Sequence, residues 1–164
     1  MYRSFNEVAW SDWQPSNRAT LLFVIRDGQV LLIDKKRGLG AGKINGPGGH
    51  IEPGESPLEC AIRETREELC VSATGVRFCG ELSFQFCDGF SLHGTVFQAS
   101  GCIGEATETD EARPRWTSLD AIPFDRMWAD DILWFPYMLA GRRFEGRFLF
   151  DGDRLVGHEL DVED

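Results

Sequence analysis

The sequence predicts an α+β domain, an α/β/α sandwich in which helices flank a mixed central β-sheet. Three observations lead to this fold class. Apolar runs typical of strands recur along the chain around Asp-Gly turns, two segments carry helical signals, and 164 residues suffice for one domain with a substantial core. Hydrophobic residues at 42% and charged residues at 27% are ordinary globular values, which disfavours disordered, collagen-like and coiled-coil chains.

The strands are indicated by apolar runs on either side of Asp-Gly pairs. We expect hairpins at Asp27-Gly28, at Asp88-Gly89 and at Asp151-Gly152. Asp-Gly between two apolar runs is a strong signal for a two-residue turn. The strands expected around these turns are Thr20–Arg26, Gln29–Lys35, 77–86, 92–100, 146–150 and 154–160. This pattern predicts several antiparallel pairs in one sheet system.

The first helix is expected to begin after Ser56, a favourable N-cap. Pro57 suits the first helical position, and Glu59 completes a capping box. Its expected apolar stripe consists of Leu58, Ile62, Thr65 and Leu69.

A second helix is expected to start near Asp130 and Asp131, because acidic residues suit a helix N-terminus. Pro136 must lie in the first turns of this helix or kink it. The polar residues 1–18 are expected to form a loosely attached arm, which leaves 19–164 as the folded domain.

The charge of the chain excludes some classes of partner. Seventeen basic residues stand against 27 acidic ones, a formal net charge of −10. Polymeric nucleic acids and anionic membranes both attract basic surfaces, so we expect neither as a partner. No stretch resembles a signal peptide or a membrane span, and the five cysteines contain no C-x-x-C pair. Free thiols in a reducing compartment are the simplest interpretation, so we expect a cytoplasmic protein.

Three glutamates form an acidic face on the first helix. Glu64, Glu67 and Glu68 fall within about 100° of one another around the helix axis. Like charges at this spacing repel, whereas a hard divalent cation with oxygen ligands would reverse the sign. A solvated acidic face with neighbouring arginines is the alternative. The segment 46–49, Gly-Pro-Gly-Gly, has too little side chain for a core strand, and its exposed carbonyls favour the metal interpretation.

The residues from Gly48 to Val71 resemble the Nudix box, a loop–helix–loop motif written G-x5-E-x7-R-E-U-x-E-E-x-G-U, where U is bulky and apolar. The matching residues are Gly49, Glu55, Arg63, Glu64, Glu67, Glu68 and Val71. Thr65 stands where an apolar residue is usual. Cys70 stands where glycine allows a left-handed helix exit, a conformation that costs a cysteine about 1 kcal/mol.

The resemblance implies the Nudix fold and a hydrolase of nucleoside diphosphate derivatives that uses Mg²⁺, with Mn²⁺ as a substitute. The implied metal ligands are the side chains of Glu64, Glu67 and Glu68 and a carbonyl of Gly48 or Gly49. Glu55 and Arg63 are implied to brace the loop against the helix. Which glutamate acts as the general base stays open.

Outside this motif, the chain resembles the MutT-homologue branch of the family, the oxidised purine nucleoside triphosphatases. The stretches that carry this likeness are 35–49, 109–139 and 142–152. In that branch the base lies between an aromatic residue and two adjacent aspartates, to which Trp128, Asp130 and Asp131 correspond. We expect one aspartate to keep a proton, because two adjacent carboxylates in a closed pocket cannot both ionise cheaply.

The resemblance also implies further residues around the substrate. Asn45 corresponds to a pocket asparagine, Lys35 to a lysine near the site, and Glu111 to a glutamate that is a second candidate for metal ligand or base. The implied pocket walls are Thr20, Leu39, Phe84, Phe86 and Trp134. Core packing is an alternative explanation for Phe84, Phe86 and Trp134, and a helix cap is an alternative for the two aspartates.

Together these features predict a monomeric, Mg²⁺-dependent pyrophosphohydrolase that cleans the nucleotide pool. Its expected partner is a small-molecule nucleotide, such as 8-oxo-dGTP or 2-hydroxy-dATP, which it would convert to the monophosphate and pyrophosphate. One alternative is a Nudix hydrolase of unmodified nucleoside triphosphates, ADP-ribose or dinucleoside polyphosphates. Another is a non-catalytic Nudix-like module that binds a nucleotide or a protein.

Overall fold

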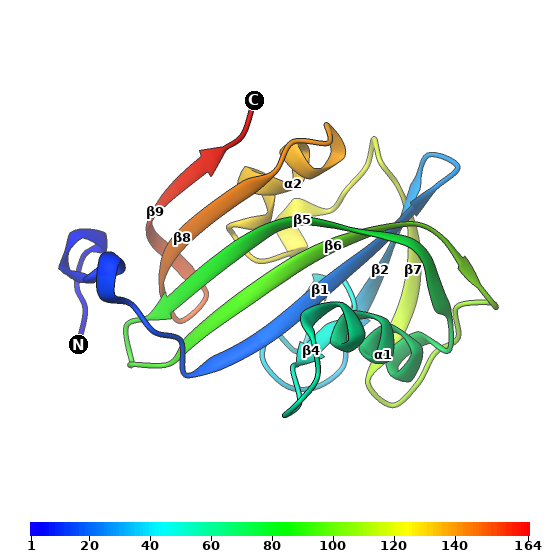
Figure 1. The fold of residues 1–164 in the computed structure, drawn as a ribbon, viewed down its shortest axis with the longest axis horizontal. Coiled ribbons are helices and arrows are strands. Elements are labelled where there is room, and N and C mark those ends of the chain that lie inside the picture. Colours follow the sequence, from blue (N-terminus) through cyan, green and yellow to red (C-terminus); the bar gives the residue numbers. More distant parts are fainter.

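The computed structural model of the protein describes residues 1–164, whose nine strands form one mixed sheet with helices on both faces (Figure 1). The strands are β1 (Asn17–Arg26), β2 (Gln29–Lys35), β3 (Ile44–Asn45), β4 (Gly48–His50), β5 (Ser72–Phe86), β6 (Ser91–Ile103), β7 (Ala112–Ser118), β8 (Phe144–Asp151) and β9 (Arg154–Val162). The helices are α1 (Pro57–Leu69) and α2 (Asp131–Leu139), and the 3-10 turns are η1 (Phe5–Glu7), η2 (Trp10–Asp12) and η3 (Phe124–Arg126). The predicted fold class is confirmed.

Strand β1 lies inside the sheet, with strands paired along both of its edges. The strand order is β3, β2, β1, β6, β5, β8 and β9, while β4 pairs with β1 and β7 pairs with β2. β1 runs parallel to β6 and β5 runs parallel to β8, and the other pairs are antiparallel. β1 therefore contacts β6 along one edge and both β2 and β4 along the other.

Alternation along β1 lets one strand contribute to two cores. Leu22 and Val24 belong to the apolar cluster that includes Leu69 of α1, whereas Phe23 belongs to the cluster that includes Trp134 of α2. Successive side chains of a strand point to opposite faces of the sheet. A strand that is covered on both faces is apolar throughout, which explains the continuous run that predicted it.

The predicted hairpin turns are present, with differences in the second and third. Asp27 and Gly28 have φ values of 53° and 74°, as a type I′ turn requires. The second connection is longer than a two-residue turn and spans residues 87–90. In the third, Asp151 already pairs with Arg154, so residues 152–153 make the turn.

Helix α1 begins as predicted, but its buried face is rotated from the predicted stripe. The side chain of Ser56 accepts from the backbone N–H of Glu59, and the Glu59 carboxylate accepts from the N–H of Ser56. Leu58 is 43% exposed, so its predicted place in an apolar stripe is wrong. The buried positions are Cys60, Ala61, Thr65, Glu68 and Leu69. Small residues on this face let the helix approach β1 and β4 closely.

The ends of the two helices follow the sequence. Cys70 ends α1 with a φ of 63°, the left-handed exit for which glycine is usual. Asp130 occupies the N-cap position of α2, and Pro136 lies in the second turn on its exposed side. None of the helices combines the length and the apolar character that a membrane crossing needs.

The segment before β1 contacts the sheet at the end where β8 and β9 lie (Figure 1). The indole N–H of Trp13 donates to the side-chain oxygen of Gln85 at 2.9 Å. Val8 is buried, and a Cβ on Gly157 of β9 would lie 2.7 Å from Phe5. Strand β1 itself begins at Asn17.

Gly48 lies so close to β1 that no side chain fits between them. A Cβ on Gly48 would lie 1.8 Å from the backbone oxygen of Thr20. As expected, segment 46–49 supplies no core strand: Gly48 and Gly49 belong to the short strand β4, which is only half-buried and adds no side chain to either core cluster. Their backbones pair with Leu21 and Thr20, so backbone hydrogen bonding replaces side-chain packing here.

We predict that Gly48→Ala lowers the free energy of unfolding by roughly 2 kcal/mol or more, because β4 must move away from β1. Gly94→Ala is the matched control. Gly94 belongs to β6, which pairs with the opposite edge of β1. A Cβ on Gly94 would meet its nearest neighbour at an ordinary 3.7 Å. Urea unfolding should place this control within about 0.5 kcal/mol of the unsubstituted protein. Equal stability of the two variants would contradict the close approach.

Candidate functional site

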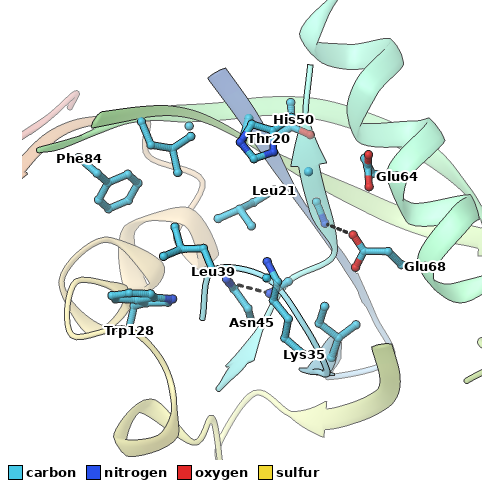
Figure 2. A pocket seen from close by; sticks show the side chains of 18 of the residues that line it. Thr20, Leu21, Lys35, Leu39, Asn45, His50, Glu64, Glu68, Phe84 and Trp128 are labelled. Carbon is cyan, nitrogen blue, oxygen red and sulfur yellow. Dashed lines mark hydrogen bonds between the residues drawn. The ribbon is translucent and has the colours of Figure 1, made fainter. Parts of the chain in front are cut away.

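Most of the predicted site residues line one cavity of about 630 Å³ (Figure 2). They are Thr20, Lys35, Leu39, Asn45, Gly48, Gly49, Glu64, Glu68, Phe84, Phe86, Glu111, Trp128, Asp130 and Asp131. The predicted site residues that do not line it are Glu55, Arg63, Glu67 and Trp134. The fold therefore brings side chains of β1 and α2, which are more than a hundred residues apart in the sequence, to the same cavity.

Three carboxylates meet at one end of the cavity. One oxygen from each of Glu64, Glu68 and Glu111 lies within 4.8 Å of the others. Glu64 and Glu68 come from successive turns of α1, whereas Glu111 immediately precedes β7. Glu111 is exposed and pairs with Arg37 at 3.1 Å. We call Glu64, Glu68 and Glu111 the acidic cluster.

Glu68 is the most buried member of the acidic cluster, at 5% exposure. The backbone N–H of Gly48 donates to its carboxylate at 3.3 Å. Burial raises the pKa of Glu68 to about 8, and the charge on Glu64 adds to this shift. Burial likewise raises the pKa of Glu64, against whose carboxylate a Cβ on Gly49 would collide.

The acidic cluster fits a divalent cation. All three donors are carboxylate oxygens, the ligand type that Mg²⁺ and other hard cations prefer. The raised pKa values of Glu64 and Glu68 measure the cost of keeping these charges buried together without a compensating cation. A divalent cation would supply that compensation.

Arg63 holds four backbone and side-chain groups around the acidic cluster. Its guanidinium donates to Glu55 at 2.6 and 2.9 Å, to Glu64 at 2.8 Å, to Glu67 at 3.1 Å and to the carbonyl of His50 at 3.2 Å. The bonds from Arg63 to Glu55 hold the pKa of that carboxyl down at about 2. The geometry agrees with the implied brace between loop and helix.

Glu67 lies on the solvent side of this arrangement. Its side chain is 56% exposed, and it is outside the acidic cluster. One nitrogen of Arg63 contacts both Glu64 and Glu67, which keeps the Glu67 carboxylate next to the cluster.

A buried carboxyl pair lies at the other end of the cavity, beside an indole. Asp130 and Asp131 are 2% and 3% exposed. The backbone N–H of Trp128 donates to Asp131 at 3.1 Å. Burial raises the pKa of Asp130 to about 6, and burial together with the charge on Asp130 raises the pKa of Asp131 well above its usual value. One proton shared by the pair at neutral pH follows from these shifts, as predicted.

Trp134 lies behind the cavity wall instead of in it. It is fully buried in the core against Phe23 and Phe135. Its indole N–H donates to Asp130 at 2.8 Å. The alternative of core packing therefore describes Trp134 better than a pocket wall does, because it holds Asp130 from one helical turn away.

The remaining predicted wall residues surround the space between the two ends. Phe84 and Phe86 extend from β5, and Phe84 stacks on Phe148 of β8 at 5.5 Å. The side-chain oxygen of Asn45 accepts from the N–H of Gly46 at 2.8 Å. Leu39 is 45% exposed on the β2–β3 loop. Figure 2 shows Leu39 and Trp128 on the same side of the cavity.

The structure also adds residues that the motifs did not indicate. His50, Arg37 and Phe150 line the cavity. Phe148 and Phe150 alternate along β8, and strand periodicity could have placed them on one face. His50 and Arg37 gave no such signal, because their places depend on the pairing of β4 with β1 and on the path of the β2–β3 loop.

Comparison with known proteins agrees with this geometry. Residues 15–138 match the NUDIX domain. The chain is 47% identical to the oxidized purine nucleoside triphosphate hydrolase of Danio rerio, over 91% of this chain and 97% of that protein. It is 41% identical to the protein of the same name from Mus musculus, over 86% and 92% of the two chains.

The fold has solved counterparts as well. The crystal structure of a MutT protein from Bacillus halodurans superimposes with a TM-score of 0.80 at 30% identity, and covers 88% of this chain and 97% of that one. The resemblance found in the sequence is thus confirmed over most of the chain. The protein belongs to the NUDIX family of hydrolases.

Proposed function

We propose that the protein hydrolyses oxidised purine nucleoside triphosphates to the monophosphate and pyrophosphate, with Mg²⁺ as its cofactor. The observation that carries this proposal is a single cavity with the aspartate pair and Trp128 at one end and the acidic cluster at the other. The two vertebrate relatives bear the name of this activity, which supports the substrate class. The role would be to remove damaged nucleotides from the pool.

The acidic cluster gives the phosphate end of the site its chemistry. Glu64, Glu68 and Glu111 would hold the metal, with Glu67 beside them through Arg63. A bound divalent cation neutralises phosphate charge and lowers the pKa of a bound water. The carboxylates orient the attacking water, and one of them accepts its proton. The water oxygen bonds to phosphorus as the bond from phosphorus to the bridging oxygen breaks, and that oxygen departs with the leaving phosphate group. Arg63 fixes the positions of Glu64 and Glu67 during this step.

The aspartate pair gives the other end of the site its selectivity. A carboxyl group that keeps its proton donates a hydrogen bond, and an ionised one accepts. Asp130 and Asp131 together therefore offer a donor and an acceptor to the altered edge of an oxidised purine. Trp128 supplies a flat apolar face, and base stacking on such a face contributes about 1–3 kcal/mol.

A substrate panel tests this proposal. Pyrophosphate release with Mg²⁺ should be at least about tenfold more efficient for 8-oxo-dGTP or 2-hydroxy-dATP than for dGTP and dATP, because discrimination by buried hydrogen bonds is at least this large. Asp130→Asn should reduce that preference and leave the Mg²⁺ dependence unchanged. Comparable kcat/KM for dGTP and 8-oxo-dGTP would exclude selectivity for oxidised purines.

Removal of one buried carboxylate should separate metal binding from folding. We predict that Glu68→Gln lowers kcat/KM at least about 100-fold and raises the Mg²⁺ concentration needed for activity. The same change should not lower the thermal stability of the metal-free protein at neutral pH. Burial raises the pKa of Glu68 to about 8, so folding at this pH takes up a proton that the unfolded chain has released, and glutamine avoids that cost. Glu105→Gln, on an exposed loop, is the control. Unchanged activity in Glu68→Gln would contradict the assigned metal site.

The aspartate pair should also make stability depend on pH. An unfolded aspartate ionises near pH 3.8, whereas folded Asp130 holds its proton until about pH 6. The folded state therefore binds the extra proton between these values, and its stability falls as the pH rises through this window. Asp130→Asn stays neutral and avoids the loss. It should match the unsubstituted protein below pH 4 and exceed its unfolding free energy by roughly 3 kcal/mol above pH 7.

Chemical unfolding across this pH range measures the difference. Asp125→Asn, an exposed position shortly before α2, is the control and should show no pH-dependent gain. A difference between Asp130→Asn and the unsubstituted protein that stayed constant with pH would contradict the buried proton.

A further inference from the structure

A second cleft, of about 300 Å³, lies beside the catalytic cavity and is lined without a single hydrophobic residue. Its basic residues are Lys35, Lys36, Arg113, Arg115 and Arg126, and its only acidic one is Asp34. We call it the basic cleft. In a chain with a net charge of −10, five cationic side chains around one hollow are a local reversal of charge.

Strands β2 and β7 lie side by side (Figure 1). Residues of these two paired strands line most of the basic cleft. Arg113 lies opposite Asp34 in this antiparallel ladder, and Arg115 lies opposite Leu32. Alternate residues of a strand share a face, so Asp34, Arg113 and Arg115 lie on the same side of the two strands. η3 adds Arg126 from the chain that precedes α2.

Asp34 satisfies only part of the hydrogen-bonding capacity of the two inner arginines. One nitrogen of Arg115 lies 3.2 Å from both Asp34 oxygens, and Arg126 lies 3.6 Å from one of them. The Nε of Arg115 is buried and has no hydrogen-bond partner. At the rim, Glu108 pairs with both Lys36 and Arg113. Lys36 also donates to the carbonyl of Thr109 at 2.7 Å. Two carboxylates still serve four cations, and guanidinium donors of Arg115 and Arg126 remain for a further anion.

Lys35 connects the basic cleft to the catalytic cavity, because it lines both. The proposed reaction yields a nucleoside monophosphate and pyrophosphate, and only pyrophosphate consists of phosphate groups without a sugar or a base. Guanidinium groups recognise phosphate oxygens with paired hydrogen bonds. A cleft without aromatic or apolar lining offers a nucleoside no surface for stacking, so it favours the product that has no base.

We propose that the basic cleft binds the inorganic pyrophosphate that leaves the acidic cluster. This inference rests on the proposed function for its ligand, but binding in the cleft needs neither turnover nor a metal. Once pyrophosphate separates from the cation, the carboxylates of the acidic cluster repel it and the cationic groups beside Lys35 attract it.

Calorimetric binding of inorganic pyrophosphate to the full chain, with divalent metal removed by a chelator, tests the proposal. Pyrophosphate should bind, and high salt should abolish the binding, because the contacts are ionic. Inorganic phosphate and a nucleoside monophosphate are titrated in parallel and should bind more weakly. Tighter binding of the monophosphate, or no pyrophosphate binding, would overturn the proposal.

Substitutions that should change pyrophosphate affinity in opposite directions distinguish a loss of contacts from a loss of folding, because a misfolded variant would not bind more tightly. Arg126→Gln and Arg115→Gln should each weaken pyrophosphate binding about tenfold, the loss of a charge-assisted hydrogen bond. Asp34→Asn should tighten it severalfold, because the two guanidinium groups lose their internal competitor. Arg77→Gln, an exposed arginine of β5 outside the cleft, is the control. Binding that stayed unchanged in Arg126→Gln and Asp34→Asn would place the pyrophosphate elsewhere.

The kinetic readout keeps this test separate from the proposed function. In Arg126→Gln the concentration of pyrophosphate that inhibits turnover should rise, while the KM for the nucleotide stays the same. Selectivity for oxidised purines could fail without affecting the metal-free titration. The titration could fail while that selectivity remained intact.

Discussion

The close contact of the Gly48–Gly49 backbone with both β1 and α1 determines where the acidic end of the cavity lies. A side chain at Gly48 would collide with the Thr20 backbone, and one at Gly49 would collide with the Glu64 carboxylate. Because neither residue has a side chain, α1 packs close enough for Glu68 to accept the N–H of Gly48. The carboxylates then point into the cavity from a helix whose other buried residues are small or serve the core.

Both ends of the cavity place carboxyl groups where water is scarce, and each end compensates for this differently. At the acidic cluster, desolvation raises the pKa values of Glu64 and Glu68, and a cation would lower them again. At the aspartate pair, the same desolvation is answered by a retained proton and by the N–H groups of Trp128 and Trp134. One physical cost therefore favours a cation at one end and a retained proton at the other.

Local signals predicted the parts of the fold that depend on neighbouring residues. The cap at Ser56 and the turn at Asp27-Gly28 each depend on a few adjacent residues, and both are present. Cys70 adopts the left-handed exit although it stands where glycine is usual. The rotated face of α1 was not predicted, because it depends on which strand the helix contacts. Periodicity alone assigned Leu58 to the core, yet it is exposed, and it did not indicate that Glu68 would be the most buried of the three glutamates on the acidic face.

The sequence by itself determined the class of the fold, the spacing of the carboxylates on α1 and the family, because these follow from periodicity and from a motif of fixed spacing. Only the tertiary structure decided that Glu111 joins Glu64 and Glu68, that Glu67 lies outside them, and that Trp134 supports Asp130 from the core. It also assembled the basic cleft from β2, β7 and η3. Such groupings arise from strand pairing and packing between distant segments, and no local pattern encodes the distances between them.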